Sequence, residues 1–163
     1  MSDVFVAGRK SSQDAAAHAL DWTAMLDSQG TPDAWSIPEA FLAILFVAVT
    51  CDGDLAAVEH EELLALAHRS RALKTLTVTE LAALNVGILE RMRRGEAVLS
   101  NACAALPDEM RLPAFAHAFD LVLADGDLNE DEADFLNSLI LGLDLHREDI
   151  DRIVTVIELK NRF

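Results

Sequence analysis

The stretch "ILFVAVTCDGDLAAVEHEEL" at residues 44–63 has a counterpart, "AFDLVLADGDLNEDEADFL", at residues 118–136. Each stretch places an Asp-Gly-Asp-Leu turn after a run of apolar residues and before a run of acids. From Asp52 to Asp125 the offset is 73 residues. At this offset further apolar residues match: Leu42, Phe46, Val49, Leu63 and Leu66 with Phe115, Phe119, Val122, Leu136 and Leu139. The chain therefore contains an internal repeat of helix, turn and helix.

Helical spacing of apolar residues extends over almost the whole chain, and alternation typical of strands is scarce. Ser36 with Glu39 and Thr77 with Glu80 fit capping boxes, which mark helix starts. Gly95, after several arginines, fits a helix end. The sequence therefore predicts an all-α protein. The expected helices are 12–27, 37–51, 57–70, 78–94, 97–105, 113–124, 130–142 and 147–160.

These helices predict a single-domain bundle of about seven or eight helices. Residues 1–35 are expected to form a leading helix and a linker, and residues 36–163 the helical domain with the repeat. Each copy carries its apolar residues on one helical face, so the two hairpins are expected to pack about a pseudo-twofold axis with their first helices at the centre. Residues 74–106 then connect the two halves.

The composition limits the classes of partner. A chain of 163 residues with a formal net charge of −15 lacks the positive surface that binding to nucleic acid or to an anionic membrane needs. No signal peptide is recognisable, and the apolar run at 40–49 is about half of the ~20 residues that span a bilayer. Cys51 and Cys103 form no disulfide framework. We therefore expect a cytoplasmic protein without direct membrane insertion.

The repeated turn resembles the second part of a calcium-binding loop. Asp52 to Glu59 and Asp125 to Glu132 share the pattern D-G-D-L-x-x-x-E with the last eight positions of an EF-hand. The first and third positions of that loop would fall on Ala48 and Thr50, and on Leu121 and Leu123. Because these residues belong to apolar helices, an ordinary EF-hand is excluded.

Two interpretations of the turns remain open. In the first, Asp52, Glu59, Asp125 and Glu132 converge to hold one divalent cation, Ca²⁺ or Mg²⁺, because one turn supplies too few oxygens for such an ion. In the second, the turns are only architectural. Gly53 and Gly126 then adopt the left-handed conformation, and Glu132 forms a capping box with Asn129.

The two quoted stretches are similar to those of the tellurite-resistance TerB family, over roughly residues 36–160. The resemblance implies an all-helical fold of two related halves. It also implies an acidic cluster for a divalent metal, here at Asp52, Glu59, Asp125 and Glu132. A bacterial, cytoplasmic protein that acts in the response to tellurite or chemical stress is implied as well. Residues before 36 match no motif of the family.

The remaining residue patterns indicate no particular class of enzyme. The five histidines fall in no zinc-protease or di-iron pattern, and no nucleotide-binding glycine loop occurs. His117 and Asp120 share a helix face, but we interpret them as ordinary core and surface residues. The "RMRRG" segment at 91–95 is interpreted as a helix end, with docking of an acidic partner as the alternative.

The function expected from the sequence is that of an accessory or interaction module. Its partners would be proteins of a stress-response complex and a divalent cation, and a homodimer is possible. The alternative is a metal-free helical scaffold that binds protein partners. A metal-dependent hydrolase, in which the cation activates water, is a weaker third hypothesis.

Overall fold

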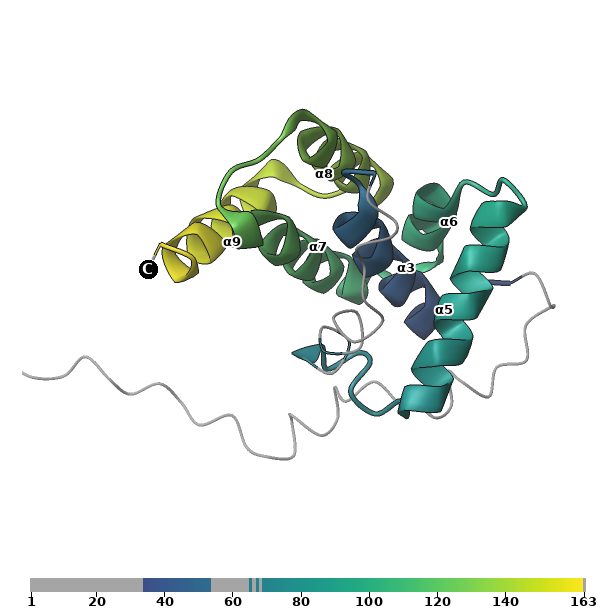
Figure 1. The fold of residues 1–163 in the computed structure, drawn as a ribbon. Helices are drawn as coiled ribbons and strands as arrows, with labels where there is room; N and C mark the ends of the chain where they lie inside the picture. The colour runs from purple at the N-terminus through teal and green to yellow at the C-terminus, as the bar shows by residue number, and fades with distance from the viewer. Residues whose placement is uncertain (1–33, 54–64, 66, 68, 163) are drawn as a thin grey trace, which may run out of the picture.

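The computed structural model describes residues 34–53, 65, 67 and 69–162, and within these ranges the chain is helical and contains no strand (Figure 1). The elements are α3 (Ile37–Thr50), α5 (Val78–Arg93), α6 (Val98–Ala105), α7 (Asp108–Val122), the 3-10 turn η1 (Leu123–Asp125), α8 (Glu130–Gly142) and α9 (Arg147–Lys160). The all-α prediction is confirmed. Six α-helices are present in the described part, fewer than the seven or eight expected. The helix expected at 12–27 and most of that at 57–70 fall outside the description.

Helix α3 forms the centre of the molecule. It packs against α5, α6 and α7 (Figure 1). Its start follows from a capping box, in which Ser36 Oγ accepts the Glu39 N–H at 3.3 Å. Buried residues lie all around it: Pro38, Ala40, Phe41, Leu42, Ala43, Ile44, Leu45, Phe46, Ala48 and Thr50. The apolar run at 40–49 is therefore a core helix, as the sequence predicts.

Helix α7 is the counterpart of α3 in the second copy of the repeat. It contacts α3, α8 and α9. Phe115 and Phe119 are buried in this core, with their rings stacked at a centroid distance of 5.8 Å. The expected contact between the first helices of the two copies is thus present. The pseudo-twofold relation stays a prediction, because it needs the segment 57–70. The domain boundary after residue 35 also stays a prediction.

Residues 74–106 do more than connect the halves. They form α5 and α6, which both pack on α3. Leu81, Ile88 and Ala102 are buried in the common core. At Gly95 (φ +74°) the end of α5 is closed by two hydrogen bonds, Glu96 N–H to Arg91 C=O and Gly95 N–H to Met92 C=O. This pattern is a Schellman motif, which confirms the predicted helix end.

The predicted start of α7 at residue 113 is wrong. The helix begins five residues earlier, at Asp108, and contains Pro113. Pro107 precedes it with an extended backbone, and Asp108 and Glu109 place negative charge at the positive end of the helix dipole. Pro113 lies in the second turn of α7, where it cannot donate the usual hydrogen bond to the Glu109 carbonyl, and the helix nevertheless continues through it.

No helix in the described ranges is both long and apolar enough to cross a membrane. This finding agrees with the length of the apolar run at 40–49.

The contact between α6 and α8 depends on a glycine. A Cβ atom at Gly142 would lie 2.9 Å from Cys103 Sγ and 3.1 Å from Cys103 Cβ. Gly142→Ala is therefore expected to lower the free energy of unfolding by about 1–3 kcal/mol, as overpacking usually does. Urea denaturation measures this change.

Gly87 in α5 is the matched control. A Cβ there would meet only Glu39 Oε1, at 3.4 Å. Gly87→Ala is expected to be neutral or to stabilise the protein by up to about 1 kcal/mol, because alanine favours helix over glycine. Equal effects of the two substitutions would contradict the close approach of α6 and α8.

Candidate functional site

The first Asp-Gly turn directly follows α3. The Gly53 N–H donates to the Thr50 carbonyl at 3.0 Å, and Gly53 has a φ of +89°. Thr50 Oγ1 donates to the Phe46 carbonyl at 2.9 Å, which holds the last turn of the helix. Asp52 is exposed to solvent. The turn thus presents an acidic side chain at the C-terminal end of the central helix.

The second turn repeats this geometry after α7. The Gly126 N–H donates to the Leu123 carbonyl at 3.1 Å, and Gly126 has a φ of +94°. A Cβ atom at Gly53 or Gly126 would meet no atom within 4 Å. The left-handed backbone conformation, rather than lack of space, therefore requires glycine in both turns. This part of the architectural interpretation is confirmed.

Glu132 caps the helix that follows the second turn. Its backbone N–H donates to Asn129 Oδ1 at 2.9 Å, and its Oε2 accepts the Asn129 N–H at 2.8 Å. The predicted capping box is confirmed. This bond engages one of the two carboxylate oxygens, so a capping role and a role as ligand are compatible.

The acids of α8 lie beside the first turn. Cys51 directly precedes Asp52 in the chain. Its thiol donates to the Ala48 carbonyl at 3.2 Å. Its pKa is raised by burial and by the negative charges of Glu132, Asp52 and Asp131. The charges of Glu132 and Asp131 therefore act on the Cys51 thiol, and in Figure 1 the C-terminal end of α3 points toward α8. The structure thus brings carboxylates from both copies of the repeat into one region.

The four predicted ligands are only partly described. Asp52 and Glu132 are placed, Asp125 is described by its backbone in η1, and Glu59 lies outside the described residues. Among the side chains that the structure places, no group of three or more His, Cys, Asp or Glu could hold a metal. The four-carboxylate site therefore stays a prediction, and the donors that are placed suit a hard cation.

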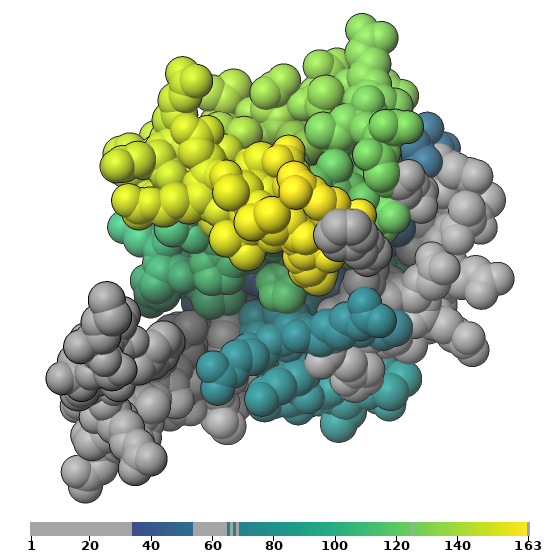
Figure 2. Space-filling view, turned by 90° about the vertical axis from the view of Figure 1, so that its left-hand side faces the viewer, coloured from purple at the N-terminus to yellow at the C-terminus, as the bar shows by residue number. Residues whose placement is uncertain are grey.

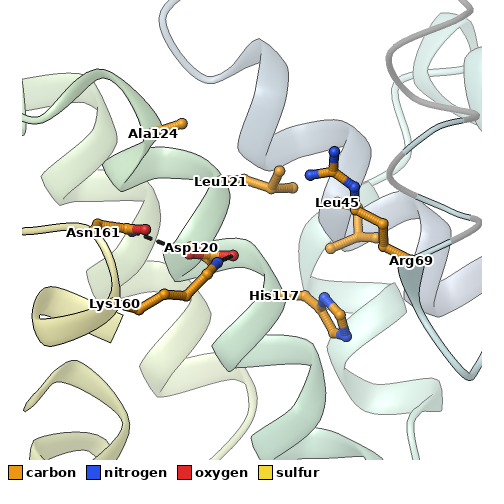
Figure 3. A pocket seen from close by; sticks show the side chains of 8 residues that line it. All are labelled: Leu45, Arg69, His117, Asp120, Leu121, Ala124, Lys160 and Asn161. Atoms are coloured by element: carbon orange, nitrogen blue, oxygen red, sulfur yellow. Dashed lines mark hydrogen bonds and ion pairs between the residues drawn. The ribbon is translucent and has the colours of Figure 1, made fainter. Parts of the chain in front are cut away.

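A second candidate site is a pocket that includes His117 and Asp120, which the sequence analysis interprets as ordinary core and surface residues. A pocket of about 500 Å³ opens between α3, α7 and the C-terminal end of α9 (Figure 3). Its lining residues are Leu45, Arg69, His117, Asp120, Leu121, Ala124, Lys160 and Asn161. The segments that meet here are far apart in sequence, so spacing in the sequence gives no signal for this pocket.

Asp120 joins α7 to the end of α9. Its carboxylate accepts hydrogen bonds from Lys160 Nζ and, at 3.1 Å, from Asn161 Nδ2. Burial raises the pKa of Asp120, but the bonds to Lys160 and Asn161 outweigh it, and the pKa lies below its ordinary value. Burial lowers the pKa of His117, although the charge of Asp120 partly opposes this. At neutral pH the pocket therefore holds an ionised carboxylate and a neutral imidazole.

The arginines of residues 91–95 are engaged within the protein. Arg91 is buried and forms ion pairs with Glu39 at 2.9 Å and Glu96 at 3.1 Å. Arg93 pairs with Glu90, and Arg94 lies 3.8 Å from Glu96. The interpretation of this segment as a helix end is supported over that of a docking surface.

The two thiols differ in burial. Cys103 is buried, and burial raises its pKa to about 11, whereas Cys51 is half-buried. Because the thiolate is the reactive form, Cys51 is expected to react with iodoacetamide at pH 8 at least about tenfold faster than Cys103. Peptide mass spectrometry over a time course measures both rates. Equal rates would contradict the burial of Cys103 between α6 and α8.

Comparison with known protein families identifies a match over most of the chain. No curated protein and no solved structure matched the chain. The sequence profile of the family described as tellurite resistance protein TerB matches residues 38–155. This range includes both Asp-Gly turns and all helices from α3 to most of α9. Since the match covers well over half of the chain, the protein belongs to the TerB family.

Proposed function

We propose that this tellurite-resistance-type module is a cytoplasmic accessory protein that binds one divalent cation, Ca²⁺ or Mg²⁺, between its two Asp-Gly turns. The ligands would be Asp52, Glu59, Asp125 and Glu132. The observation that carries the proposal is that the negative charges of Glu132 and Asp131 act on the thiol of Cys51, the residue before Asp52. Carboxylates from separate copies of the repeat thus share one region, as a common site requires.

The electrostatics favour a cation at this place. The chain has a net charge of −15, and like charges that are held together by the fold repel one another. Calcium takes six to eight oxygen ligands, and magnesium keeps several waters beside a few carboxylates. Two pairs of carboxylates, together with backbone carbonyls and water, would satisfy either ion.

Such an ion would connect the two halves of the domain. Asp52 follows α3, whereas Glu132 lies in the first turn of α8. A cation between them would fix the end of the central helix against the second hairpin. The ion would then adjust the rigidity of a surface that contacts proteins of a stress-response complex.

Isothermal titration calorimetry of protein freed of metal tests the proposal. We expect one Ca²⁺ or Mg²⁺ per chain in the wild type and at least tenfold weaker binding in Glu132→Gln. Glutamine keeps the capping box but removes the charge, so this variant separates the two roles of Glu132.

Asp151→Asn is the matched control for the titration. This acid is exposed in α9, and its substitution changes the net charge equally. It is expected to bind the ion as the wild type does. Absence of ion binding by the wild type at millimolar concentrations would reject the proposal for Ca²⁺ and Mg²⁺.

A second candidate function is that of a metal-free scaffold for protein partners. It is favoured by three exposed apolar side chains of α5, namely Val78, Val86 and Leu89, with exposed fractions of 55%, 62% and 37%. A homodimer through this face would be lost in Val86→Ser, which sedimentation measures. An ion-independent oligomer that is lost in this variant would favour the scaffold over the metal-binding module.

A further inference from the structure

The pocket beneath α9 differs in charge from the rest of the protein. Its ionised lining residues are Arg69, Lys160 and Asp120. Lys160 and Asp120 neutralise each other through their ion pair. Arg69 is exposed and forms no ion pair with the acids that the structure places. Over the lining residues that the structure describes, the pocket thus has one net positive charge, in a chain whose net charge is −15.

Hydrogen-bond donors outnumber acceptors in this pocket. The Lys160 ammonium has three N–H donors, of which Asp120 occupies one. The Arg69 guanidinium carries five, and Figure 3 shows it beside Leu45 and Leu121. A neutral His117 adds one further donor. The Asp120 carboxylate already accepts one bond from Lys160 and one from Asn161, so each of its two oxygens is engaged within the protein.

An apolar wall faces these donors. Leu45 from α3 and Leu121 from α7 line the pocket together with Ala124 of η1. The ring of His117 is held edge-on against Phe41, at a centroid distance of 5.8 Å. Helix α9 (yellow in Figure 2) crosses the surface on this side of the molecule. A volume of about 500 Å³ exceeds that of an inorganic anion and suits a small organic molecule.

We propose that this pocket binds a small organic anion. Its carboxylate or phosphate would lie between Arg69 and Lys160, and its apolar part against Leu45, Leu121 and Ala124. The planar fork of an arginine suits both carboxylate and phosphate oxygens. The site would give the module a ligand that is independent of the cation between the Asp-Gly turns.

NMR titration of the ¹⁵N-labelled protein in EDTA tests this proposal without any contribution from divalent ions. The probes are hexanoate, hexyl phosphate, hexan-1-ol and inorganic phosphate. We expect saturable shifts at residues 117–124 and 160–161 with hexanoate or hexyl phosphate. Whichever of these two binds more tightly identifies the preferred acid group. Hexan-1-ol and inorganic phosphate are expected to bind at least tenfold more weakly. Hexan-1-ol lacks the acid group, and inorganic phosphate lacks the apolar part.

Two substitutions of arginine separate the site from general electrostatics. Arg69→Gln is expected to weaken binding at least tenfold. Arg147→Gln removes the same charge from an exposed position at the opposite end of α9 and is expected to change affinity less than twofold. Lys160→Gln, which alters the other cation, serves as a second variant and is expected to weaken binding as well.

The titration of His117 gives an independent readout. An anion bound near the imidazole favours its protonated form, so the pKa of His117 is expected to rise on binding. Asp120, Lys160 and Arg69 are the charged groups around it. Three results would each overturn the proposal: no saturable binding of either organic anion, equal losses in Arg69→Gln and Arg147→Gln, or binding of hexan-1-ol as tight as that of the anions.

Discussion

Arg91→Met is expected to lower the free energy of unfolding by about 3–5 kcal/mol, the cost of removing one partner from a buried ion pair. Arg91 is only 5% exposed. Its Nε donates to Glu39 Oε1 at 2.9 Å, its Nη1 to Glu96 Oε2 at 3.1 Å, and its Nη2 to the Ala34 carbonyl at 3.3 Å. Its guanidinium also lies 4.3 Å from the centroid of the Trp35 ring. Methionine keeps much of the volume but leaves the carboxylate of Glu39, which is 12% exposed, without its cation.

Arg93→Met is the matched control in the same helix. Arg93 pairs with Glu90 at 2.9 Å, but the two side chains are 74% and 46% exposed. An exposed pair of this kind contributes less than about 1 kcal/mol. Urea denaturation of both variants measures the difference. Similar losses in the two variants would show that the cluster around Arg91 does not hold α5 against the start of α3.

The second large expected effect is the stabilisation of the folded protein by a bound divalent cation. At a free concentration of 100 times its dissociation constant, a bound cation would stabilise the wild type by about 2.7 kcal/mol. Asp52→Asn is expected to abolish this stabilisation. Without the ion the variant should be as stable as the wild type or more stable, because one of several repelling charges is removed. Thermal melts in chelator, Ca²⁺ and Mg²⁺ measure both quantities.

The capping interpretation gives a different pattern in the same melts. Asn129→Ala removes the N-cap of α8 and is expected to cost about 0.5–2 kcal/mol in every buffer. It leaves the carboxylates of the predicted site in place, so the ion-dependent shift should persist. If Asp52→Asn lowers the stability equally with and without ions, and ions do not shift the melting temperature of the wild type, the metal-free scaffold is favoured over the metal-binding module.

Most helix boundaries are predictable because their signals are local. Asn129 and Glu132 satisfy each other's backbone amides within one turn, and α8 begins where this capping box predicts. The predicted ranges 130–142 and 147–160 coincide with α8 and α9. Pro113 misleads because proline is typical of a helix start, whereas here the extended Pro107 and the acids after it set the start of α7.

The candidate sites depend more on contacts between distant residues. The offset of the repeat predicts that the two Asp-Gly turns belong together, and the charge of Glu132 at Cys51 supports this. No comparable regularity connects Asp120 to Lys160, which are 40 residues apart. The sequence shows His117 and Asp120 on one helix face, but only the packing of α9 against α7 completes the pocket.

A paramagnetic ion tests most directly whether both turns share one cation. Mn²⁺ accepts the same oxygen ligands as Mg²⁺ and Ca²⁺, and it broadens the NMR signals of nearby nuclei. In a titration of the wild type with less than one equivalent of Mn²⁺, we expect the amide signals of 51–53 and 125–132 to broaden together. Excess Mg²⁺ should reverse the effect, and Asp52→Asn should weaken it in both segments. Broadening of one turn alone, or none at either turn, would contradict a common site.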